Sequence, residues 1–85
     1  MERIEQLNIE LEQTRNELII VKEELNDVFR QLWKIRLKKA KNDDYDHKRY
    51  EELTYANRLL QMERRKLITH MNFLNKEFYE ICFGK

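Results

Sequence analysis

Leucine and isoleucine recur at every seventh residue along most of the chain, from Ile4 to Ile81. The column is interrupted at two successive positions, Lys39 and Asp46. One apolar residue in seven, sustained over so many helical turns, is typical of helices that pair side by side in a coiled coil. The pattern therefore predicts an all-α chain whose apolar stripe is covered by another helix.

A second column accompanies the first, mostly apolar in the first half of the chain and partly polar in the second, and its spacing changes along the chain. It lies three residues after the leucine column in residues 1–35 and four residues after it in residues 51–83. That change equals an insertion of four residues, a stutter that locally unwinds a coiled coil. We therefore treat 1–85 as one coiled-coil segment in which a break at 36–50 separates two heptad blocks. The predicted dimer seam comprises Ile4, Leu7, Leu11, Leu18, Val21, Leu25, Val28, Leu32, Ile35, Leu53, Asn57, Leu60, Leu67, Met71, Leu74, Phe78 and Ile81.

The sequence favours one long helix that forms a parallel two-stranded coiled coil, with the stutter at the break. In such a homodimer Glu10 would meet Arg15 of the partner helix, and Glu17 would meet Lys22, as interchain ion pairs. Asn57 at a seam position also suits a parallel dimer, because its side chain can bond to its own copy. An unbroken helix of about 80 residues would be about 120 Å long.

The alternative is a helical hairpin that turns near 41–44, or an antiparallel coiled coil or four-helix bundle. Basic residues before the turn and acidic residues after it suit the end of one helix dipole and the start of the next. Asn42 would end the first helix, and Asp43 or Asp44 would cap the second. Against this fold, the bend offers no glycine, and Asn57 would face an apolar side chain. Folding back would pair Leu32 with Leu53, Leu25 with Leu60, and Leu18 with Leu67.

Composition narrows the class of protein. The chain contains no proline and a single glycine, Gly84, while 39% of its residues are charged and the net charge is +1. Long helices suit this composition better than a turn-rich globule does. A helical rod offers no enclosed pocket for catalysis, and the sequence contains no glycine-rich phosphate loop, so we expect no enzyme, small-molecule substrate or cofactor. His47, His70 and Cys82 lack the close spacing of a metal site, and we expect none.

Apolar side chains outside the seam are candidates for docking a further protein. We therefore expect a dimerisation and scaffolding or adaptor segment of a larger intracellular protein, with a cytoplasmic or cytoskeletal location. The start of the chain is unlike a signal peptide, no stretch is apolar enough to span a bilayer, and the single cysteine fits a reducing compartment. The candidate docking residues are Phe29, Trp33, Leu37, Leu59, Met62 and Phe73.

A basic run after Trp33 supports an alternative function. A cluster of cations on one helix can bind a polyanion, either nucleic acid or an anionic membrane. The near-neutral net charge argues against that function, and we expect neither partner. The cations concerned are Lys34, Arg36, Lys38, Lys39 and Lys41.

Overall fold

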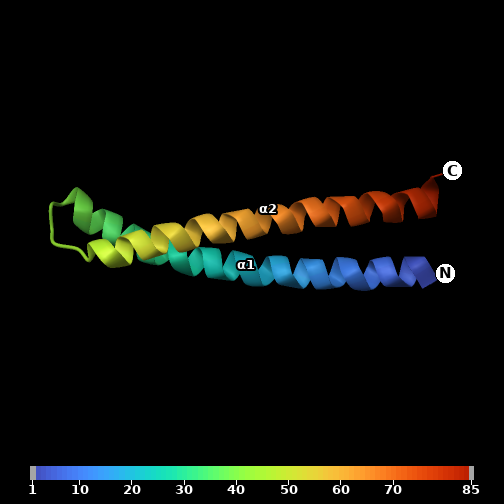
Figure 1. Cartoon of the computed structure of the whole chain (residues 1–85), viewed down its shortest axis with the longest axis horizontal. Helices are drawn as coiled ribbons and strands as arrows, with labels where there is room; N and C mark the ends of the chain where they lie inside the picture. Colours follow the sequence, from blue (N-terminus) through green and yellow to red (C-terminus); the bar gives the residue numbers. More distant parts are fainter. Residues whose placement is uncertain (1, 85) are drawn as a thin grey trace.

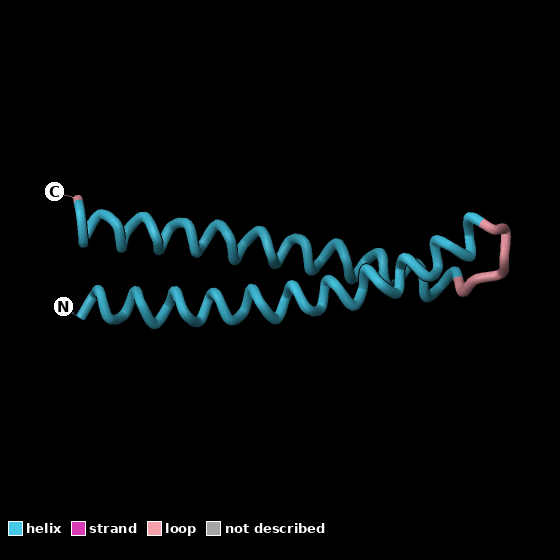
Figure 2. Tube along the Cα trace, turned by 180° about the vertical axis from the view of Figure 1, so that it is seen from behind, coloured by secondary structure: helices cyan, strands magenta, loops and turns pink. Residues whose placement is uncertain are grey.

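The computed structural model describes residues 2–84, which form two helices and no strand. Helix α1 runs from Glu2 to Ala40 and helix α2 from His47 to Phe83. The helices lie antiparallel and wind around each other, so that both ends of the chain lie at the same end of the molecule (Figures 1 and 2). The all-α prediction is confirmed.

The favoured expectation of one continuous helix is not met, and the chain instead forms the hairpin that the sequence left as the alternative. The molecule measures 62 × 18 × 15 Å, about half the length of the rod expected for an unbroken helix. The leucine column loses its apolar character at Lys39 and Asp46, and the chain leaves the helix between residues 40 and 47. The break in the heptads is therefore a turn in this structure.

The turn begins with a left-handed residue at the end of α1. Asn42 has a φ of 59°. The amide of Asn42 donates to the carbonyl of Lys39 at 3.1 Å, and the amide of Asp43 donates to that of Lys38 at 2.9 Å. This pair of bonds is a Schellman motif, which satisfies carbonyl groups left free at a helix end. Asparagine tolerates the left-handed conformation better than other non-glycine residues, so the turn does not need a glycine.

A single side chain caps the start of α2. The carboxylate of Asp46 accepts a hydrogen bond from the backbone amide of Arg49 at 3.0 Å. The expected caps, Asp43 and Asp44, precede the helix by too many residues to perform this role, because an N-cap must stand next to the first helical turn. Beside the cap, the ring of Tyr45 packs on that of His47, with ring centroids 4.2 Å apart.

The predicted seam residues line the contact between α1 and α2. All of them are buried or half-buried except Ile81. Leu18 and Val21 pack with Leu67, and this cluster also includes Leu25 and Leu60, as the hairpin alternative predicts. Nearer the open end of the hairpin, which lies opposite the turn, Leu7 and Leu11 form a second cluster with Leu74. Met71 and Phe78 extend this cluster. The stripe on each helix is thus covered by the other helix of the same chain.

The side chain of Asn42 provides a direct test of the hairpin against a straight helix. In the left-handed position, glycine would relieve strain and alanine would add it, each by about 1 kcal/mol. We therefore expect Asn42→Gly to raise the melting temperature and Asn42→Ala to lower it. In a continuous helix the order would be the reverse, since alanine favours helix over glycine by about 1 kcal/mol. Thermal denaturation followed by circular dichroism distinguishes the two orders.

Candidate interaction surface

The middle of the seam is covered less completely than the stretches on either side of it. Between the buried Val21 and Leu32, the seam positions Leu25 and Val28 are only half-buried. On α2 the opposing seam positions Asn57 and Leu60 are half-buried too. Side chains at this level therefore remain accessible along the two edges of the seam.

One edge of this central stretch forms a groove that we call the basic groove. It has a volume of about 330 Å³, and its charged side chains, Lys22 and Arg64, are both cationic. Among residues 2–84 no buried side-chain nitrogen or oxygen lacks a hydrogen-bond partner. Asn57 and Arg64 are half-exposed here, so the expected penalty for facing apolar residues is avoided. The groove is lined by Lys22, Leu25, Asn26, Phe29, Asn57, Gln61 and Arg64.

The other edge, at the same level, forms a groove that we call the acidic groove. Its volume is about 420 Å³, and its charged side chains, Glu24 and Asp27, are both anionic. The remaining lining is apolar and comes from both helices: Val28, Ala56, Leu59 and Leu60. The seam separates the two grooves. Apart from the seam residues themselves, the basic groove is lined from heptad positions on one side of the apolar stripe, and the acidic groove from positions on the other side.

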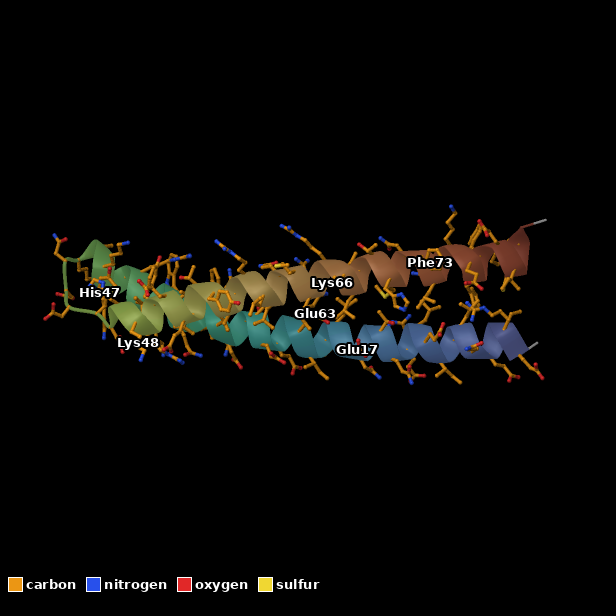
Figure 3. All side chains as sticks on the ribbon, in the orientation of Figure 1. Glu17, His47, Lys48, Glu63, Lys66 and Phe73 are labelled. Carbon is orange, nitrogen blue, oxygen red and sulfur yellow. The ribbon has the colours of Figure 1, made fainter. Side chains whose placement is uncertain are left out.

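The acidic character extends along this edge beyond the groove. Glu17 lies two helical turns before Glu24 on the same stripe of α1, and Glu63 lies two turns after Ala56 on α2. Figure 3 shows Glu17 and Glu63 on their two helices at neighbouring levels of the hairpin, with Lys66 beside them. Because like charges repel, a cationic group near these two glutamates is favourable.

The same edge carries an ion pair near the open end. The guanidinium of Arg3 donates through Nη2 to Oε1 of Glu77 at 2.7 Å and through Nε to Oε2. Hydrogen bonding from Arg3 lowers the pKa of Glu77, and desolvation opposes that shift. The hydrogen bond to Glu77 likewise raises the pKa of Arg3. This bidentate pair holds the first turn of α1 to the last turns of α2.

The candidate docking side chains all lie outside the seam. Phe29 and Trp33 stack with their ring centroids 6.3 Å apart, and both are about half exposed. Figure 3 shows Phe73 toward the open end of α2, and its side chain is 66% exposed. Leu37, Leu59 and Met62 are exposed as well. Three further exposed apolar residues of α1 were not among the predicted docking residues, although their heptad positions also place them off the seam: Ile9, Ile19 and Ile20.

The residues proposed for interchain ion pairs and for polyanion binding occupy separate places. Glu10 and Glu17 lie on the edge of the acidic groove, whereas Arg15 and Lys22 lie on the edge of the basic groove. Within residues 2–84, none of these four forms a salt bridge; the salt bridges join Arg3 to Glu77, Arg30 to Asp27 and Arg49 to Glu52.

The basic run lies in the last turns of α1 and the first residue of the loop, at the closed end of the hairpin. All five cations of the run are exposed. The ammonium group of Lys39 lies 5.4 Å from the centre of the Tyr50 ring. Figure 3 shows His47 and Lys48 at the same end, at the start of α2. Asp43, Asp44 and Asp46 in the adjoining loop offset part of this positive charge.

Neither helix in the described part of the chain is long and apolar enough to cross a membrane. Within residues 2–84, no group of three or more histidine, cysteine, aspartate or glutamate side chains is arranged to hold a metal ion. Cys82 is a free, exposed thiol. Comparison with known protein families, with curated proteins and with solved structures finds no match for this chain.

Glu77→Gln tests the ion pair through its pH dependence. Because the pKa of Glu77 is lowered in the folded chain, its carboxylate stabilises the fold above the ordinary glutamate value of 4.5. That contribution is lost as the pH falls through the lower folded value. We expect the melting temperature of the parent chain to exceed that of the variant near neutral pH, and the difference to shrink below pH 4.5. Glu80→Gln is the matched control, and an equal pH-dependent difference for it would contradict the assignment.

Proposed function

We propose that the hairpin is a self-associating helical module that scaffolds other proteins. The observation that carries this proposal is the number of large apolar side chains left exposed on both sides of the seam, including Phe29, Trp33 and Leu59. Monomeric soluble proteins rarely leave extended apolar patches uncovered, and such patches are typical of protein interaction sites.

The surface area of the chain supports self-association. The hairpin exposes 7092 Å². A compact protein of 10.7 kDa exposes about 5,500 Å², so the hairpin has an excess of about 1,600 Å². Stable protein interfaces bury about 1,200–2,000 Å² in total. About half of such an interface belongs to each partner, so pairing with one more copy would remove roughly half of the excess from each hairpin.

The small core supports the same proposal. The fully covered apolar side chains form one row between two helices. A single core of this size rarely provides more than about 3–5 kcal/mol of net stability. Contacts with a neighbouring molecule would add to that stability by mass action.

Self-association would arise by one of two routes. In the first, folded hairpins pair through the surfaces beside the seam. In the second, the hairpin opens and two chains form the parallel coiled coil that the sequence favours. The first route retains the intrachain seam, and the apolar side chains beside it favour this route. A further protein would then dock on apolar side chains that self-association leaves uncovered, such as Phe73 near the open end.

A dilution series tests self-association. We expect the mass from sedimentation equilibrium to rise above 10.7 kDa as the protein concentration is raised. The fluorescence of Trp33, the single tryptophan, should shift to shorter wavelength over the same range, because association would remove its exposed ring from water. Ile9→Ser, which removes an exposed side chain away from both grooves, is the control and should leave the mass unchanged. A mass that stays at 10.7 kDa at every concentration would contradict the proposal.

The exposed cations at the closed end support polyanion binding as a second candidate. If the basic run binds single-stranded nucleic acid or anionic vesicles, affinity should fall steeply with salt because counterions are released. Lys34→Gln together with Lys38→Gln should weaken that binding, while Lys66→Gln, on the middle of α2, should not. We expect little binding of either ligand at physiological salt, since three aspartates adjoin the run. Tight, salt-sensitive binding that the paired substitutions abolish would favour this candidate instead.

A further inference from the structure

The basic and acidic grooves lie back to back, on opposite sides of the same stretch of the seam. The basic groove uses Lys22 and Arg64, and the acidic groove uses Glu24 and Asp27. The carboxylate of Asp27 also lies 3.8 Å from the guanidinium of the exposed Arg30, so Glu24 carries most of the uncompensated charge. We propose that the basic groove of one copy docks on the acidic groove of the next, so that hairpins stack face to opposite face. This inference rests on the proposed self-association and specifies its geometry.

Charge decides between this arrangement and a symmetric dimer. A two-fold dimer uses the same patch on both copies. A symmetric dimer through the basic groove would place the cations Lys22 and Arg64 of one copy against the same cations of the other copy. A symmetric dimer through the acidic groove would likewise place Glu24 and Asp27 against Glu24 and Asp27. Like charges brought together across an interface are costly, whereas the unlike pairing is favourable and directs the approach of the two copies.

The apolar side chains also fit the unlike pairing. Phe29 borders the basic groove and is 54% exposed. The acidic groove of a neighbouring copy offers a volume of about 420 Å³ with Val28, Leu59 and Leu60 in its lining. An aromatic ring inserted into an apolar pocket with charged groups around it is the usual arrangement of an interface hot spot. Phe29 of one copy would therefore be the anchor, and the four charged groups would fix its orientation.

The position of the grooves determines what such a contact builds. A copy that uses its basic groove still presents its acidic groove on the opposite side. A contact between two different patches closes into a ring or continues as an open assembly. Because the two grooves lie on opposite sides of the pair of helices, successive copies stack in one direction, and the assembly is open-ended.

Two single substitutions, one on each side, test the arrangement. Phe29→Glu places a negative charge on the basic side, and Leu59→Glu places one in the acidic groove. Each alone should weaken self-association by at least about tenfold, since either side is needed for growth. An equimolar mixture should form a one-to-one complex of twice the 10.7 kDa chain mass and nothing larger. That complex would join the intact acidic groove of the first variant to the intact basic groove of the second.

The outcomes separate this inference from the proposed function. A parent chain that remains monomeric overturns both. A parent chain that associates, but whose mass stops at a dimer or whose association depends on only one of the two side chains, overturns the stacking alone. Failure of the mixed variants to form the one-to-one complex also overturns it. Circular dichroism checks that each variant keeps its helices, and Phe29→Ser with Leu59→Ser replaces any glutamate variant that does not.

Discussion

The structure depends on covering a stripe of leucines on α1 that would otherwise face water. Burying one leucine contributes about 1.5–3 kcal/mol, so leaving the whole stripe exposed would cost more than a small domain can offset. The covering helix comes from the same chain because the backbone reverses after α1. That reversal relies on Asn42 in a left-handed conformation and on Asp46 as the cap of α2. Two residues outside the seam thus decide which helix covers it.

The middle of the hairpin combines weak burial with a clear separation of charge. Asn57 and Arg64 are polar at the positions of α2 that, one and two heptads nearer the open end, hold Met71 and Phe78, which pack on the leucine clusters. The level of Asn57 and Arg64 therefore stays partly open. The openings on its two edges acquire opposite charge from residues that lie beside the seam. A feature that weakens the intrachain core therefore provides the best-defined surface for contact with another molecule.

The heptad pattern predicted the all-α fold, because a seven-residue apolar repeat depends only on helix geometry. Most residues at its seam positions lie between the two helices of the one chain. It did not determine which helix fills the seam, since the same stripes suit a parallel partner and an antiparallel one. In the sequence, Asn57 argues against the hairpin because burying its polar side chain without a partner would cost free energy. In the structure Asn57 lies half-exposed at the rim of a groove, so that cost does not arise. The absence of glycine at the bend misled in the same way, because asparagine occupies the left-handed position.

The candidate surface was predictable only in part. Register along each helix places Phe29 and Leu59 outside the seam, so their exposure follows from the sequence. The grooves could not be predicted from the sequence, because each groove combines residues of both helices. Which residues of α1 lie beside which residues of α2 depends on where the chain turns. Only in the antiparallel alignment does Lys22 line the same groove as Arg64, and Glu24 the same groove as Ala56.

Antiparallel pairing in one chain also sets the order in which contacts can close. The hydrogen bond between Gln31 and Arg49 spans 18 residues, whereas the pair of Arg3 and Glu77 spans 74. Closing the longer loop first would cost about 1 kcal/mol more in chain entropy. Once contacts beside the turn have formed, each further pair closes only a short additional loop. We therefore expect the contacts between the helices to form first beside the turn and then progressively toward the open end. When the hairpin opens, the start of α1 and the end of α2 should separate first.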